Sequence, residues 1–297
     1  TTGLLEAHSQ RWAAEILRVV GVQQEQLADL VAPGTVVGPL RADVLARTGL
    51  RSTTELSTVG SHDTASAVAA VPAAGPDFAY VSCGTWALVG VELDAPLISD
   101  RGLRGGFTNE IGVDGTVRYL HNVMGLWILQ QTMADWQARG VPADLPALLA
   151  AAADSPSGGP VFDVDHPELQ SLGDMPARIA RACRRAGFDP PEGRPAMVRC
   201  ILDSMASAMA RAVREACALT GRRVSVVHLV GGGARNGLLC QLVADAVGLP
   251  VVAGPVEATA IGNLLVQART HGLNAGDRYT LRDLVRRTQQ LTRYEPR

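Results

Sequence analysis

The sequence has 297 residues, enough for about two domains and a sizeable core, although one large domain remains possible. Hydrophobic residues make up 47% and charged residues 19%, which is the composition of a globular protein and excludes a disordered or fibrous one. The 27 Lys and Arg nearly balance the 29 Asp and Glu, and no dense basic run stands beside aromatic residues, so we expect a small-molecule partner and no nucleic acid.

The first part of the sequence predicts short connecting elements. Helical spacing of apolar residues predicts three short helices, over residues 10–20, 23–31 and 42–49. A strand candidate follows at residues 55–59, and a Gly-Ser-His-Asp turn leads into a helix predicted at residues 64–70. We expect these elements to connect and pack rather than to form a core.

Two strands and two longer helices are predicted in the middle of the chain. Residues 78–83 and 86–93 have the pattern of strands, and the Gly-Thr pair between them is typical of a hairpin turn. Apolar residues at helical spacing predict an amphipathic helix over residues 122–140. Between Val198 and Ala216 the i, i+3, i+4 spacing is unbroken, which predicts a long helix.

Strands and helices alternate in the last part of the chain. The predicted strands lie at residues 224–230 and 250–254, and the predicted helices at residues 235–248 and 255–270. Such alternation is typical of α/β proteins, in which right-handed crossovers join parallel neighbours. We therefore expect an α/β fold.

The glycine run Gly231–Gly233 lies between a strand and a helix, where a bare backbone can approach a ligand and the helix N-terminus favours negative charge. Three interpretations remain open. A dinucleotide-binding turn would need a glycine where Asn236 stands, although an acidic residue, Glu257, follows the next strand. A P-loop would need Lys-Ser or Lys-Thr after the glycines, and neither is there. The turn could also bind nothing.

Asp63 raises a second question, because it stands at the mouth of an apolar helix. A carboxylate at a helix N-terminus stays ionised and is aligned by the helix dipole, which suits a general base. The alternative is that Asp63 only caps the helix. The local pattern by itself favours the cap.

The five cysteines show no Cys-x-x-Cys spacing and no nearby histidine that would complete a zinc site, so we interpret them as mostly buried thiols. Cys183 and Cys200 flank a loop rich in proline and glycine and could be close enough to bridge, but a reducing cytosol favours free thiols. His121 and His228 stand among apolar residues and are interpreted as structural. No metal ligands are predicted in this chain.

Nothing in the sequence predicts export or a membrane anchor. No apolar segment approaches the roughly 20 residues of a spanning helix. The first residues also lack a charged segment followed by an apolar one. We therefore expect a cytoplasmic protein without membrane contact.

Several blocks of the sequence, taken together, resemble the FGGY family of carbohydrate kinases, and most of all its rhamnulokinases. The blocks are "GSHDTASAVAAVP", "VSCGTWALVGVEL", "TNEIGVDGTVRYLHNVMGLWILQQ", "VHLVGGGARNGLLCQL" and "GPVEATAIGN", in family order. The likeness spans essentially the whole chain. It implies an actin-like ATPase fold of two ribonuclease-H-like lobes, with ATP and sugar bound in the cleft between them. Residues 1–71 would be the end of the N-terminal lobe, and residues 72–297 the C-terminal, nucleotide-binding lobe.

The resemblance also implies roles for individual residues. Asp63 would be the catalytic base that takes the proton of the sugar's primary hydroxyl, and His62 and Thr64 would touch the sugar. The positions implied to contact the nucleotide are Thr85, Asn122, Gln130, Gly232, Gly233 and Asn236. Asn236 could instead cap the helix that follows it, and Glu257 is expected to cap the last long helix.

Asn122 and Gln130 are separated by about two helical turns. Both are therefore expected to face one groove of the helix predicted at residues 122–140. The hairpin turn at Thr85 and the glycine run would contribute the remaining nucleotide contacts, according to the resemblance.

The likeness implies ATP and Mg²⁺ as cofactors, and phosphorylation of a ketose, most of all L-rhamnulose to L-rhamnulose 1-phosphate. The Asp-x-Gly-Thr phosphate loop that these kinases carry in the N-terminal lobe is not found in the sequence. The chain is therefore interpreted as a fragment, whose protein partners would be the missing lobe or a second copy. The alternative is a truncated, catalytically inactive paralogue that at most binds nucleotide.

Overall fold

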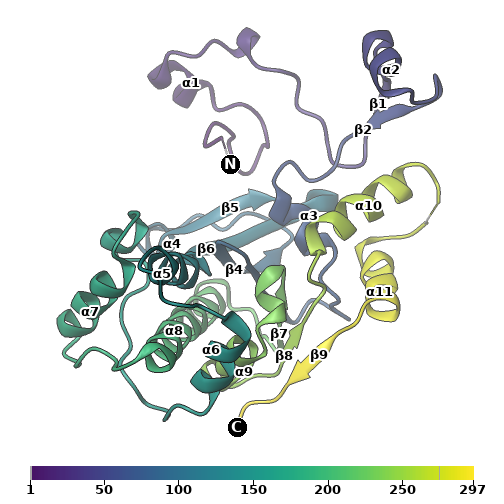
Figure 1. Cartoon of the computed structure of the whole chain (residues 1–297). Helices are drawn as coiled ribbons and strands as arrows, with labels where there is room; N and C mark the ends of the chain where they lie inside the picture. Colours follow the sequence, from purple (N-terminus) through teal and green to yellow (C-terminus); the bar gives the residue numbers. More distant parts are fainter. Residues whose placement is uncertain (1, 274) are drawn as a thin grey trace.

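A computed structural model describes residues 2–273 and 275–297, and a seven-stranded sheet forms its centre (Figure 1). The strands are β3 (Phe78–Cys83), β4 (Trp86–Leu93), β5 (Phe107–Ile111), β6 (Val117–Met124), β7 (Val226–Val230), β8 (Val251–Ala253) and β9 (Thr292–Tyr294). Their order across the sheet is β5-β6-β4-β3-β7-β8-β9. β7 runs parallel to both β3 and β8, and the remaining neighbours are antiparallel. The sheet is therefore mixed, with a parallel centre.

The hairpin predicted at residues 78–93 is confirmed. β3 and β4 pair antiparallel, with Tyr80 opposite Gly90. Gly90 lets the next strand approach, because a Cβ at this position would lie 2.2 Å from the carbonyl oxygen of Tyr119 in β6. The parallel neighbours β7 and β8, joined through the predicted helix α9 (Gly237–Val247), are confirmed as well.

Helices cover both faces of the sheet (Figure 1). The first face carries α5 (Trp127–Ala138), α6 (Leu145–Ala153), α7 (Met175–Arg185), α8 (Arg194–Thr220) and α9, and the second carries α3 (Asp63–Ala69), α10 (Ala258–Thr270) and α11 (Arg278–Thr288). Because successive strand residues point to opposite faces, Val81 joins the core under α8, whereas Tyr80 joins the core under α3 and α10. The predicted α/β architecture is therefore confirmed.

The long helix predicted between Val198 and Ala216 is confirmed as α8, which ends where Gly221 takes a left-handed backbone conformation, φ +69°. Short elements connect the others: α4 (Asp100–Arg104), η2 (Val113–Gly115), η3 (Pro167–Gln170) and η4 (Gly232–Arg235). In the described part of the chain, no helix combines the length and the apolar character that a bilayer crossing requires.

The helix predicted over residues 122–140 is wrong at its start. Residues up to Met124 belong to β6, in which Asn122 pairs with Leu88 of β4, and α5 begins only at Trp127. Gly125 separates the two elements, since a Cβ there would lie 2.6 Å from the carbonyl oxygen of Gly84. Strand pairing along the whole length of β4 outweighs the helical spacing, so Asn122 and Gln130 do not share a helix face.

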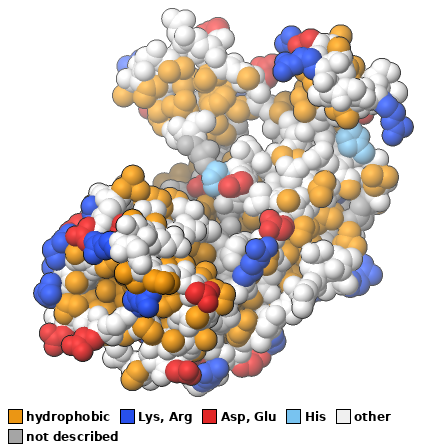
Figure 2. All heavy atoms as spheres, in the orientation of Figure 1, with side chains coloured by type: hydrophobic (Ala, Val, Ile, Leu, Met, Phe, Trp, Pro, Cys, Tyr) orange, Lys and Arg blue, Asp and Glu red, His pale blue; other side chains and the backbone are white. Residues whose placement is uncertain are grey.

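Residues 2–59 extend away from the main body (Figure 1). Their elements are α1 (Ala14–Val20), η1 (Gln24–Gln26), β1 (Val36–Pro39), α2 (Ala42–Thr48) and β2 (Glu55–Ser57), so the helix predicted at 42–49 is confirmed and the one at 23–31 is wrong. Leu17 is the single buried side chain among the described residues of this part. Apolar side chains gather on its surface (Figure 2), and Val19 is 81% exposed.

The boundary placed at residue 71 stays a prediction. The helix before it, α3, lies against α10 of the main body, and all its residues after Asp63 are buried. By its packing, α3 therefore goes with the sheet rather than with residues 2–59.

Four of the five cysteines are buried, and Cys217 is half-buried. The Sγ atoms of Cys183 and Cys200 lie 3.7 Å apart as free thiols, in agreement with the interpretation of buried thiols. His228 is 4% exposed in β7 with its ring edge-on to Phe78, and burial lowers its pKa to about 3. This burial agrees with the structural role expected for His228.

Candidate functional site

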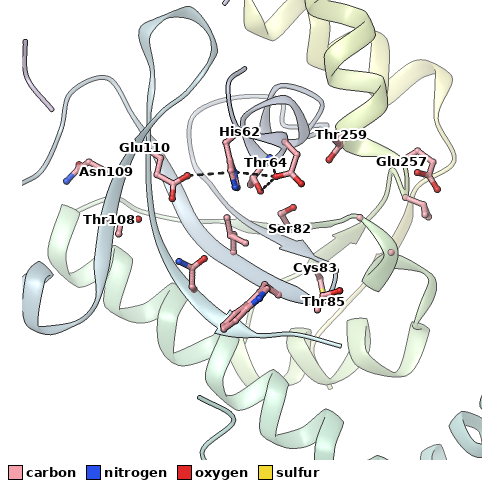
Figure 3. A pocket seen from close by; sticks show the side chains of 18 of the residues that line it. His62, Thr64, Ser82, Cys83, Thr85, Thr108, Asn109, Glu110, Glu257 and Thr259 are labelled. Atoms are coloured by element: carbon pink, nitrogen blue, oxygen red, sulfur yellow. Dashed lines mark hydrogen bonds and ion pairs between the residues drawn. The ribbon is translucent and has the colours of Figure 1, made fainter. Parts of the chain in front are cut away.

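A cavity of about 960 Å³ lies where several distant segments of the chain meet (Figure 3). Its walls come from the start of α3, the turn between β3 and β4, strands β5 and β6, the glycine run after β7, and the segment that leads into α10. The predicted site residues that line it are His62, Asp63, Thr64, Thr85, Asn122 and Gly232. The structure thus gathers most of the predicted site from segments far apart in sequence.

Asp63 occupies the first position of α3, and its side chain is 72% exposed. Its Oδ1 accepts a hydrogen bond of 2.6 Å from the backbone N–H of Thr64. His62 takes the N-cap position, so the interpretation of Asp63 as merely the cap is wrong. The sharp entry into the helix requires Gly60, where a Cβ would lie 2.6 Å from the Cβ of Ala65. The carboxylate of Asp63 is therefore presented to the cavity.

Glu110 is a cavity residue that sequence reasoning missed. It lies on β5 and faces His62 across the site (Figure 3). His62 Nδ1 lies 3.8 Å from Glu110 Oε2 and 3.4 Å from Asp63 Oδ1. An opposite charge on the neighbouring strand, Arg118, could have indicated that Glu110 points inward. That pairing is known only once the strand register is known.

Thr85 lies at the tip of the β3–β4 turn, exposed to the cavity. The turn closes through a 2.8 Å bond from Gly84 N to Trp86 O, and the chain after β6 supports it from outside. Gly125 N donates to Thr85 O at 3.1 Å, and Leu126 N donates to Gly84 O at 2.9 Å. Backbone hydrogen bonds, rather than side chains, therefore fix the turn that carries the Thr85 hydroxyl.

The three glycines of the run have different roles. Gly231 adopts φ +85° and packs on the carbonyl oxygen of Cys83, 2.9 Å from where a Cβ would lie. Gly233 is buried against Cys83, whose Sγ would lie 2.5 Å from a Cβ. Gly232 has open space around it and lines the cavity. Of the two glycines predicted to contact the nucleotide, the structure brings Gly232 to the cavity and places Gly233 beneath it.

Gly231 and Gly233 both pack against Cys83. Its thiol is fully buried, and burial raises its pKa to about 12. At neutral pH it is therefore an inert, protonated thiol that packs rather than reacts.

Asn236 is 7% exposed, and its Oδ1 accepts a 3.1 Å bond from Leu239 N, so it caps α9. It borders a separate cavity of about 730 Å³ beside α6 and α9. Gln130 is exposed on α5 and does not line the main cavity. The cap expected from Glu257 is wrong: it stands at the N-cap of α10 without a capping bond, 3.5 Å from Arg235, and lines the main cavity. An N-cap needs a short side chain, and that of Glu is too long.

The charged side chains that line the main cavity are carboxylates, and two of them are paired with arginines outside the lining, Glu110 with Arg118 and Glu257 with Arg235. Asp63, Glu110 and Glu257 line the cavity, and no arginine does so among the described residues. A cation would favour the binding of a polyanionic ligand beside these carboxylates. Within the described residues, however, no three His, Cys, Asp or Glu side chains form a group that could hold a metal ion.

Comparison with known proteins places the chain in a family. Residues 79–271 match the FGGY family of carbohydrate kinases, C-terminal domain. The chain is 41% identical over 296 residues to a rhamnulokinase of Bacteroides thetaiotaomicron. The match covers 100% of this chain and 60% of that relative. It is 38% identical to a rhamnulokinase of Enterococcus faecalis, over 90% of this chain and 54% of the relative. The chain thus spans 54% to 60% of the length of these relatives.

Solved structures agree on the fold. A ligand-bound xylulose kinase from Lactobacillus acidophilus superposes with a TM-score of 0.75 at 18% identity, covering 100% of this chain and 58% of that one. A Plasmodium falciparum glycerol kinase with ADP superposes with a TM-score of 0.71 at 13% identity, covering 99% and 57%. The expected actin-like sugar kinase fold is confirmed.

Proposed function

Because the chain belongs to the FGGY family of carbohydrate kinases, we propose that it forms the nucleotide-binding lobe and carries the catalytic base of an ATP-dependent ketose kinase. The observation that supports this most is the cavity itself. It collects Asp63, Thr85 and Gly232 from three separate segments, so that a carboxylate lies at one part of the wall and hydroxyls and bare backbone at another. Such a wall suits a ligand pair that carries a hydroxyl and a phosphate chain.

In the proposed reaction, the primary hydroxyl oxygen of the sugar forms a bond to the γ-phosphorus of ATP. The bond between that phosphorus and the bridging oxygen breaks, ADP leaves with the electron pair, and the hydroxyl proton passes to Asp63. His62 and Thr64 flank this carboxylate and would contact the sugar. Thr85 and Gly232 would lie along the phosphates, and Asn122 beside the nucleotide.

The proposed substrate is L-rhamnulose, and the product L-rhamnulose 1-phosphate, because the relatives at 38–41% identity are rhamnulokinases. The proposed setting is the cytoplasm, with Mg²⁺ bound to ATP. The apolar surface of residues 2–59 fits a contact with the part of the relatives that this chain does not span. That same missing length favours a second candidate function, a nucleotide-binding paralogue without catalysis.

Titration of the 297-residue chain with ADP, followed by calorimetry, tests the nucleotide site. We expect binding by the wild type and at least about tenfold weaker binding by Gly232→Val, since a side chain there would fill the space that a ligand needs. Gly75→Val is the matched control, because this glycine too has open space around it, has no left-handed backbone and lies outside the cavity. Equal heats for wild type and Gly232→Val would contradict the site, and a response to NADH instead of ADP would favour a dinucleotide.

Activity is tested in a completed kinase, in which the part of the Bacteroides thetaiotaomicron rhamnulokinase that this chain does not cover is joined to it. We expect ATP-dependent phosphorylation of L-rhamnulose. Binding of ADP without turnover on any ketose would favour the inactive paralogue.

A further inference from the structure

Glu110 has a buried ionic partner and an unsatisfied oxygen beside the proposed base. Across the β5–β6 pair it stands opposite Arg118, and Arg118 Nη2 lies 2.9 Å from Glu110 Oε2. The Arg118 side chain is 1% exposed and that of Glu110 13%. Oε2 nevertheless receives no well-aligned hydrogen bond from any described residue. A buried ion pair of this kind is a weak source of stability, because desolvation offsets the attraction.

The pair belongs to a row of charges buried beneath α3. Arg118 also stands opposite Glu92 of β4, and Glu92 accepts hydrogen bonds of 2.8 and 3.0 Å from Arg282 of α11. Arg282 in turn donates to the carbonyl oxygen of Val68 in α3. The row of charges thus starts beneath the C-terminal part of α3, the helix that begins with Asp63. It ends at Glu110, which lines the cavity.

His62 lies between the end of this row and Asp63. Its Nδ1 is buried and, like Glu110 Oε2, has no hydrogen-bond partner in the described part of the chain. The two atoms, neither of which has a hydrogen-bond partner among the described residues, lie 3.8 Å apart, and Figure 3 shows the side chains directed toward each other. A shift of the imidazole by about 0.6 Å would bring the two atoms into hydrogen-bond range. Buried polar groups left in this state carry a large free-energy cost, which favours that shift.

We infer that Glu110, held by Arg118, is a positioning residue that fixes the tautomer and orientation of His62. A carboxylate on each side of Nδ1 places the ring proton there, so Nε2 is left as an acceptor. In the proposed sugar kinase, Nε2 accepts a hydrogen bond from a sugar hydroxyl next to the one that Asp63 deprotonates. The identity of that ligand rests on the proposed function, whereas the contact between Glu110 and His62 does not.

The first experiment needs no substrate. The 297-residue chain is labelled with ¹⁵N-histidine, the signals of His62 are assigned with His62→Gln, and the ring ¹⁵N shifts are measured at one alkaline pH. We expect the Nδ1-protonated tautomer in the wild type and a shift toward the other tautomer in Glu110→Gln. Asp94→Asn, which removes an exposed carboxylate outside the cavity, should leave the His62 signals unchanged. Unchanged signals in Glu110→Gln would overturn the inference.

A second variant guards against simple misfolding. Glu110→Leu combined with Arg118→Met replaces the ion pair by apolar groups of similar volume, which buried sites often accept without loss of stability. This double variant should stay folded and still show the altered His62 tautomer. A folded double variant with wild-type His62 signals would mean that Glu110 only neutralises Arg118, and would overturn the inference.

Kinetics of the completed kinase test the positioning role of Glu110 separately from the proposed function. We expect the double variant to lose about tenfold to a hundredfold in kcat with L-rhamnulose, the scale of a small misplacement, while KM for ATP stays within about twofold. Wild-type kcat in the folded double variant would overturn the inference. If the wild-type completed kinase were inactive on every ketose, the proposed function would fail, and the histidine spectra would still decide the role of Glu110.

Discussion

Gly262 of α10 packs so closely on α3 that a Cβ at this position would lie 1.8 Å from the carbonyl oxygen of Ser66. The crossing joins the helix that begins with Asp63 to the helix that begins beside Glu257 and Thr259, and all three of these residues line the cavity. Ala258 and Val266 are buried on the same face of α10 as Gly262. This close approach of Gly262 to the Ser66 backbone therefore helps to fix the distance between Asp63 and the start of α10 at the cavity.

Gly262→Ala should destabilise the fold. Alanine forms helices better than glycine by about 1 kcal/mol, but the added methyl group would collide with backbone that cannot rotate away. We expect a net loss of at least about 2 kcal/mol in the free energy of unfolding, measured by urea denaturation. Gly75→Ala, where a Cβ meets open space, should stay within about 0.5 kcal/mol of the wild type. An equally stable Gly262→Ala chain would show that the two helices are not in contact in solution.

Asp63→Asn should abolish most of the turnover of the completed kinase. The amide keeps the shape of the side chain and cannot accept the proton, so kcat should fall by at least about a hundredfold, while KM for ATP changes little. Steady-state kinetics with L-rhamnulose measure both constants. Retention of most of the wild-type kcat would remove Asp63 from the role of base.

The 297-residue chain by itself should not phosphorylate sugar. Phosphoryl transfer depends on positioning and on charge stabilisation around the γ-phosphoryl group, and no arginine lines this cavity among the described residues. A correctly placed base contributes only about 10² to 10⁴ in rate. A coupled assay with ATP, Mg²⁺ and L-rhamnulose decides the matter, and turnover of about 1 s⁻¹ or more would contradict the expectation.

His228 should make the fold less stable as the pH falls. Burial, and then the charges of nearby arginines, lower its pKa from 6.5 to about 3, so the unfolded chain binds a proton in this range that the folded chain does not. The free energy of unfolding is therefore not reduced by His228 above pH 6.5, and it falls progressively as the pH decreases from 6.5 toward 3. Between pH 7 and pH 5 the loss should be about 2 kcal/mol.

Urea denaturation at the two pH values measures this loss. The His228→Gln chain provides the reference, because it cannot take up the proton and the other titrating groups are the same. The wild type should lose about 2 kcal/mol more than the variant on going from pH 7 to pH 5. Parallel behaviour of the two chains would mean that His228 is hydrated or protonated in the folded state.

Much of the architecture was encoded locally. The unbroken apolar spacing of α8, the Gly-Thr hairpin between β3 and β4, and the alternation that ends in α10 each depend on neighbouring residues, so the sequence predicted them. The cavity residues Asp63, Thr85 and Gly232 were expected in the site because their sequence blocks resemble those of the family; the local pattern by itself indicated only a helix start, a hairpin turn and a glycine turn.

What the tertiary structure decided depends on partners distant in sequence. Asn122 is in a strand because β4 pairs along the whole of β6, and that pairing overrides the helical spacing around it. Glu110 enters the site only because the register sets it opposite Arg118 and the fold brings α3 over it, so a hydrophilic residue in a short strand gave no local sign of its role. Gly232 faces the cavity because it has open space around it, whereas Gly233 packs against Cys83 and does not reach the cavity. The sequence determined which turns could hold a ligand; strand register and helix packing, which join residues distant along the chain, decided which side chains meet in them.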